Sequence, residues 1–81
     1  MPRTYSYEEL DTVPIPQDIP ELGVDAGRVG VVDFTYDGGR GLHVEVSRTD
    51  GSTAGFVQME LRAGEAGEVW HVVAYSPFSS S

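Results

Sequence analysis

The chain has 81 residues, no cysteine, and a formal net charge of -8 from 13 acidic and 5 basic residues. This length suits one small domain, the missing cysteines exclude disulfides and thiol chemistry, and the negative charge opposes binding to phosphate backbones, so we expect no nucleic-acid partner. No stretch approaches the about 18 apolar residues of a membrane-spanning helix, and no apolar signal segment opens the chain, which favours a cytoplasmic location without a membrane partner.

The first predicted element is an extended segment over residues 13–23, VPIPQDIPELG. Pro14, Pro16 and Pro20 each lack a backbone N–H, which a central strand needs on both sides. The segment is therefore predicted to be an edge strand or an extended connection. The apolar residues between the prolines anchor it to the core.

Residues 27–36, GRVGVVDFTY, have the composition of a strand with one irregularity. The apolar residues do not alternate strictly, because three positions separate the first two predicted inward residues. Gly30 lies in this break, which indicates a bulge or a sharp bend. The predicted inward residues are Val29, Val32, Phe34 and Tyr36.

Residues 37–41 contain three glycines and are predicted to reverse the chain into a strand over residues 42–47. That strand alternates cleanly, with Leu42, Val44 and Val46 on one face and His43 and Glu45 on the other. This pattern is typical of a sheet with one face in water.

A second turn at Asp50-Gly51 leads into a strand over residues 53–61, and a third turn leads into the last strand, residues 68–75. This last strand has bulky residues on both faces. Val69, His71, Val73 and Tyr75 are expected on one face, and Trp70, Val72 and Ala74 on the other. It is either central between two layers or presents apolar surface to a partner.

This pattern predicts an all-β fold, a small SH3-like barrel of about five antiparallel strands. The expected divisions are an N-terminal arm over residues 1–12, the barrel domain over residues 13–76 and a disordered tail over residues 77–81.

The chain resembles the DUF4926 family of small bacterial proteins over residues 10–61. The resemblance rests on the segments DIPE (18–21), GRVGVV (27–32), VEV (44–46) and DG (50–51). It implies an SH3-like barrel and no established activity. The chain departs from the family pattern at Val31, where the family usually has threonine, and in its extra apolar strand at residues 68–75.

Residues that titrate near neutral pH are few, since the chain has two histidines. His43 shares its predicted face with Glu45, but two ligands do not make a metal site. His71, between Val69 and Val73, is expected to be a core or interface histidine. We therefore predict no catalytic residue, no metal and no cofactor, with His43, Glu45 and Asp33 as the least poor candidates if the chain is an enzyme.

The aromatic side chains are the better functional lead, because they are too many for one small core and because tyrosine and tryptophan are enriched at interfaces. The alternative is that Trp70 and Phe56 close the ends of the barrel while the tyrosine hydroxyls reach water. The candidate partner-binding residues are Tyr36, Phe56, Trp70 and Tyr75.

The hypothesis from the sequence is a non-catalytic, acidic protein-binding module. Its partner is another protein, favoured if basic, or a second copy of the chain. One alternative is an antitoxin or immunity-type inhibitor that neutralises a basic protein. A second alternative is a small accessory subunit of an enzyme.

Overall fold

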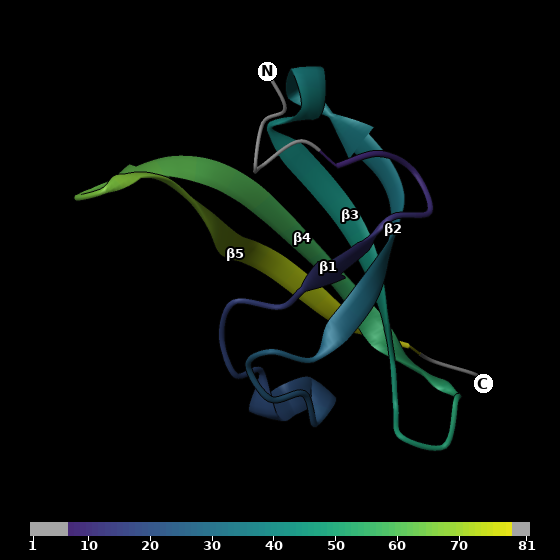
Figure 1. Cartoon of the computed structure of the whole chain (residues 1–81). Coiled ribbons are helices and arrows are strands. Elements are labelled where there is room, and N and C mark those ends of the chain that lie inside the picture. Colours follow the sequence, from purple (N-terminus) through teal and green to yellow (C-terminus); the bar gives the residue numbers. More distant parts are fainter. Residues whose placement is uncertain (1–6, 79–81) are drawn as a thin grey trace.

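A computed structural model describes residues 7–78 of the chain. Five antiparallel strands and two short 3-10 turns make up this part (Figure 1). The elements are β1 (Thr12–Pro14), η1 (Pro20–Leu22), β2 (Val29–Tyr36), η2 (Asp37–Gly39), β3 (Gly41–Ser47), β4 (Thr53–Gly64) and β5 (Gly67–Pro77).

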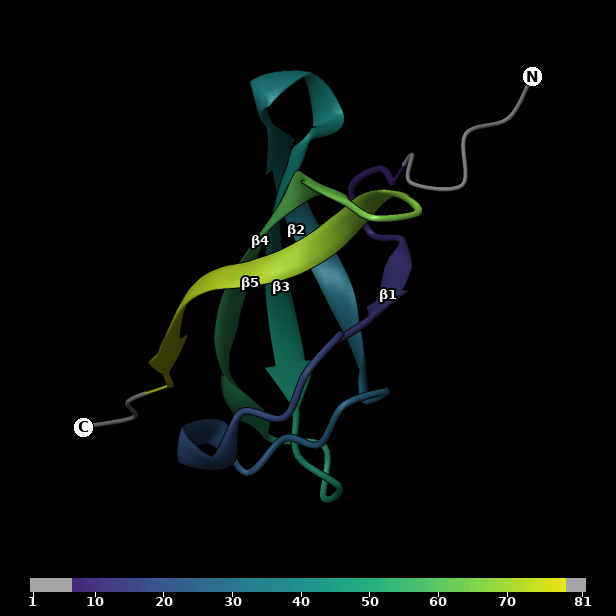
Figure 2. The same ribbon diagram turned by 90° about the vertical axis from the view of Figure 1, so that its left-hand side faces the viewer.

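The strands form a single sheet in the order β1-β2-β3-β4-β5, so each strand pairs with its neighbour in sequence. The sheet curls into a half-barrel, and the two edge strands, β1 and β5, come round to the same side (Figure 2). Within residues 7–78 no backbone hydrogen bond joins β1 to β5. The prediction of a small all-β, SH3-like barrel is confirmed, with an open seam between its edges.

The core fills the inside of the curl and is entirely apolar among the described residues. The alternation predicted for β3 is confirmed, and β4 alternates in the same way, because the inward residues of both strands are buried. The extended segment after β1 covers the open side of the curl with four more buried residues. The core residues are Val13, Ile15, Ile19, Leu22, Val24, Val32, Leu42, Val44, Val46, Ala54, Val57, Met59 and Leu61.

The prediction of which β2 residues face inward is largely wrong. Val32 is buried as expected, but Val29 is 54% exposed and Phe34 is 49% exposed. The pairing of β2 with β3 shifts between Val32 and Phe34, so the bulge lies at Asp33. One extra residue in a strand inverts every later side chain, which explains why Phe34 faces outward.

Gly30 has a different role from the one predicted, because it lies inside the curl and packs closely against β3. A Cβ atom at this position would be 2.5 Å from Cγ1 of Val44 and 2.9 Å from the Glu45 carbonyl oxygen. The glycine is therefore needed for a close approach to the core, which glycines in strands often mark.

A second bulge explains why both faces of β5 are bulky. Gln58 pairs with Ala74 and the next residue, Met59, with Val72, which leaves Val73 as the extra residue. Trp70 and Tyr75 therefore lie on the inner side, and the prediction that they take opposite faces is wrong. His71 is exposed and lies opposite Glu60 on the outer side, so it is not a core histidine, and the expectation of an interface histidine stays a prediction.

The residues before β1 continue its pairing with β2. The Leu10 N–H donates to the Val32 carbonyl (2.8 Å), and the Val32 N–H donates to the Asp11 carbonyl (2.8 Å). Tyr7 packs against the core. Residues 1–6 of the expected arm and 79–81 of the expected tail lie outside the described residues. Between residues 7 and 78 there is no helix with the length and apolar character needed to span a membrane.

Candidate partner-binding face

We call the side of the sheet that faces away from the core the outer face. It displays most of the polar and aromatic side chains of β2, β3 and β4. Phe34, His43 and Gln58 lie opposite one another on these three strands. Glu45 lies opposite Phe56 in the same way. Because the chain neighbours of these residues on β3 and β4 are buried, strand alternation places these side chains on the outer face.

Three rings on the outer face form a stack across three strands. The centroids of Phe34 and His43 are 4.7 Å apart with their planes within 6°, and those of His43 and Phe56 are 5.4 Å apart at 26°. Phe34, at the end of this aromatic stack, is 49% exposed, and Val31 beside it on β2 is 40% exposed. The stack therefore presents apolar surface to the solvent in place of burying it.

Carboxylates border the aromatic stack, and each is fixed by one of its two oxygens. Oδ2 of Asp33 lies 3.2 Å from Nδ1 of His43, and Oε2 of Glu45 accepts a hydrogen bond from Oγ1 of Thr53 (2.9 Å). Since an ionised carboxylate has about four acceptor sites, these groups retain acceptor capacity. They give the edge of the stack an ordered negative charge.

The end of the outer face next to η2 holds a small network around Tyr36. Its hydroxyl donates to Oε2 of Glu60 (3.1 Å) and accepts from Nε2 of Gln58 (2.8 Å). Partial burial, together with the hydrogen bond and charge of Glu60, raises the pKa of Tyr36 above 10.0, although the Gln58 hydrogen bond opposes this. The ring covers Gly41, where a side chain would collide with it.

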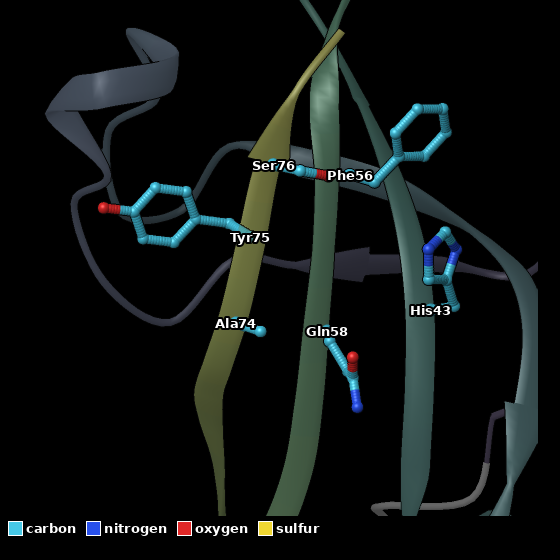
Figure 3. A pocket seen from close by; sticks show the side chains of 6 residues that line it. All are labelled: His43, Phe56, Gln58, Ala74, Tyr75 and Ser76. Carbon is cyan, nitrogen blue, oxygen red and sulfur yellow. The ribbon is translucent and has the colours of Figure 1, made fainter.

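A shallow cavity of about 180 Å³ lies along β3, β4 and β5 beside the stack. Figure 3 shows His43, Phe56 and Gln58 on the strands that frame it, whereas the Tyr75 ring turns toward η1. The cavity extends the outer face as far as β5. Its lining residues are His43, Phe56, Gln58, Ala74, Tyr75 and Ser76.

The four predicted partner-binding residues do not form one site. Tyr36 and Phe56 lie on the outer face, whereas Trp70 lies at the open seam with its ring centroid 5.9 Å from that of Tyr7. Tyr75 is 41% exposed, and its hydroxyl hydrogen-bonds Glu21 of η1, which raises the pKa of Tyr75. The sequence grouped these residues by type, and it did not anticipate the bulge that brings Trp70 and Tyr75 to the inner side.

The open seam holds a second cavity, of about 300 Å³. Nε1 of Trp70 is buried and has no hydrogen-bond partner among residues 7–78. Trp70 therefore packs against the core at the seam, whereas Phe56 lies on the outer face, so the two do not close the ends of the barrel together. The lining residues are Tyr7, Val13, Pro14, Pro16, Glu68, Val69 and Trp70.

Phe34 is the member of the site that sequence reasoning missed. The available signal was Asp33, a charged residue inside an apolar run, which marks the bulge better than Gly30 does. His43 was expected to be solvated. It does lie on the wet face with Glu45, as predicted, but its ring is sandwiched between Phe34 and Phe56.

The four arginines in residues 7–78 each make a hydrogen bond or an ion pair. Arg28 donates to the Ser47 carbonyl and Arg48 to the Thr53 carbonyl. Arg40 pairs with Glu68, and Arg62 lies 3.7 Å from Glu60. Within residues 7–78, Asp33 and Glu45 therefore form no ion pair with an arginine.

The chemistry available to the pair of His43 and Asp33 is limited. The carboxylate orients the imidazole, as in a general base, but within residues 7–78 His43 makes no hydrogen bond to a hydroxyl group. Ser76 in the same cavity is two strands away, about 10 Å between backbones. In residues 7–78, no three histidine, aspartate or glutamate side chains are grouped so as to hold a metal ion.

No family model matches the chain, and no curated protein or solved structure matches it either. The resemblance to the DUF4926 family therefore stays a prediction. Function has to be inferred from the geometry of the outer face.

Proposed function

We propose that this chain is a non-catalytic protein-binding module that takes a basic partner protein on its outer face. The observation that carries the proposal is the half-exposed aromatic stack of Phe34, His43 and Phe56, bordered by Asp33 and Glu45. Exposed apolar surface rimmed by polar groups marks interaction sites. The carboxylates make a basic partner the complementary one.

The charges contribute in two ways. The net charge of -8 attracts a basic protein over long range and raises its rate of association. At close range Asp33 and Glu45 are already held by His43 and Thr53, so little side-chain order has to be imposed on binding. The rings then supply apolar contact area with little conformational entropy to lose.

This mode of binding suits an inhibitor of the antitoxin or immunity type, which would cover the positive site of a basic protein. It also suits an accessory subunit that recognises a basic surface of an enzyme. A gene for a basic protein next to the gene for this chain would support either role. A cytoplasmic location is part of this proposal.

The test compares the affinity of an unstructured arginine- and lysine-containing peptide for the native chain and for a Phe34→Ala/Phe56→Ala variant. We expect the double variant to bind at least about tenfold more weakly, because aromatic truncations at interface centres cost about 2 kcal/mol or more. Val69→Ala is the matched control, since Val69 is 47% exposed but lies on β5. An acidic peptide of equal length serves as the negative ligand.

The chain has one tryptophan, and it reports on the location of binding. Trp70 lies at the seam, so a ligand on the outer face leaves its emission unchanged. Equal affinity of the native chain and the double variant, or quenching of Trp70 emission on binding, would contradict the proposal.

Self-association is a second candidate, favoured by the free edge of β5. Within residues 7–78 the only strand that pairs with β5 is β4, and β5 carries no proline before its last residue. The β1 edge, by contrast, is protected by Pro14 and Pro16. Light scattering distinguishes the two candidates, because salt weakens binding of a basic partner but screens the repulsion between two acidic copies. A monomer at every salt concentration contradicts self-association.

A further inference from the structure

We infer that the outer face selects arginine over lysine side chains of its basic partner. This inference rests on the proposed function and names the chemical group that the face recognises. It follows from the shape of the aromatic stack and from where the nearest carboxylate lies.

The stack offers a flat surface of the kind that a guanidinium group covers. One side of the Phe34 ring lies against His43, nearly parallel and 4.7 Å away, yet 49% of the residue remains exposed. The exposed surface therefore lies where His43 does not cover the residue. A planar guanidinium group stacks on such a ring by both cation–π attraction and dispersion.

The carboxylate of Asp33 lies at the edge of the same stack. Its Oδ2 is 3.2 Å from Nδ1 of His43, the ring that stacks on Phe34. A cation against the exposed part of Phe34 therefore lies near this carboxylate, which is held at the next ring of the stack. The five N–H donors of arginine project in the plane of the group, so it can stack on a ring and donate to a carboxylate at the ring edge simultaneously.

Lysine combines ring stacking and carboxylate binding less effectively than arginine. Its ammonium group is compact and strongly hydrated, and it loses more hydration when it lies on an apolar ring. Glu45, two positions along β3 from His43, attracts either side chain equally as a charge. The difference between the two cations therefore comes from Phe34 and Asp33.

The cavity beside Phe56 is suited to a neighbouring residue of the bound peptide. It has a volume of about 180 Å³ and adjoins His43, so it continues from the stack toward β5. Its lining includes the apolar Ala74 and the amide of Gln58 (Figure 3). A neighbouring side chain of the peptide contacts the alanine, and the amide remains available to the peptide backbone.

The experiment measures the affinity of three peptides that differ in one residue type by isothermal titration calorimetry. The peptides carry arginine, lysine or citrulline at the same positions, and citrulline keeps the shape of arginine without its charge. At low ionic strength we expect the arginine peptide to bind about two- to fivefold more tightly per cation than the lysine peptide. The citrulline peptide should not bind measurably.

Two variants test which residues cause the preference for arginine over lysine. Phe34→Leu keeps an apolar side chain but removes the ring, so the arginine and lysine peptides should bind it equally. Asp33→Asn should reduce the preference while retaining the fold, because the changed residue is a third exposed. Val69→Ala is the control that leaves the preference intact. Thermal unfolding of each variant confirms that it is folded.

The outcomes separate the two proposals. If both cationic peptides bind but lysine binds as tightly as arginine, the arginine inference is wrong and the proposed function stands. If neither peptide binds, both are wrong. If arginine is preferred but the preference survives Phe34→Leu, the preference comes from another surface and the inference is overturned.

Discussion

Replacing Gly41 with alanine tests how Tyr36 is held on the outer face. The added Cβ would lie 2.2 Å from Cε2 and 2.3 Å from Cζ of the Tyr36 ring. Carbon atoms pack at about 3.5 Å or more, so the ring has to move by about 1 Å. The backbone of Gly41 is not in the left-handed region, and alanine adopts it without strain. The clash with Tyr36 is therefore the main cost.

The size of the effect follows from three contributions. Overpacking of this kind costs about 1–3 kcal/mol, and the displaced hydroxyl weakens its hydrogen bonds to Glu60 and from Gln58, which contribute about 1 kcal/mol each. Alanine also lowers the conformational entropy of the unfolded chain, which stabilises the folded state by about 0.4–1 kcal/mol. We expect Gly41→Ala to lower the free energy of unfolding by about 1–3 kcal/mol.

A double-mutant cycle with Tyr36→Ala checks this reasoning. Urea unfolding followed by Trp70 fluorescence measures each of the four proteins. Without the Tyr36 ring, Gly41→Ala should be neutral or slightly stabilising, so that the coupling energy is about 1–3 kcal/mol. An equal cost of Gly41→Ala with and without the Tyr36 ring would show that the ring does not pack against Gly41.

Three other changes have outcomes that the structure predicts. Met59 is fully buried, so Met59→Ala should cost about 2–5 kcal/mol in urea unfolding, and a cost below 1 kcal/mol would mean that the core is not packed as described. The hydroxyl and backbone N–H of Ser52 donate to Asp50 and hold its pKa below the ordinary value of 3.8. Asp50→Ala should therefore lower the free energy of unfolding at neutral pH. This loss should disappear as the pH falls below 3.8, and a loss that persists in acid would contradict the prediction. Removing the Glu21 hydrogen bond by Glu21→Ala should lower the pKa of Tyr75, as seen by ultraviolet titration of tyrosinate, and an unchanged pKa would show that the hydrogen bond does not form in solution.

The strands and turns could be predicted from the sequence because each rests on a local pattern. The clean alternation of Leu42, Val44 and Val46 identified their face correctly, and Asp50-Gly51 lies in the turn between β3 and β4. The proline-rich segment was placed correctly at an edge. These features depend on residues within a few positions of one another, so the sequence alone contains them.

The faces of β2 and β5 could not be predicted, because bulges invert them. Whether the irregularity of β2 falls at Gly30 or at Asp33 depends on the pairing with β3, which is a tertiary property. As a result Phe34 was assigned to the core, and the aromatic stack was not foreseen. Trp70 and Tyr75 were grouped with Tyr36 and Phe56 by residue type, although they lie on the other side of the sheet.

Chemical-shift mapping shows whether a basic partner binds the outer face. The measurement titrates the arginine peptide into the ¹⁵N-labelled chain. We expect the shifted amides to cluster in residues 31–36, 42–45 and 56–60, while the Trp70 indole signal stays in place. Shifts concentrated at Tyr7, Val13 and Trp70, around the seam, would contradict this expectation.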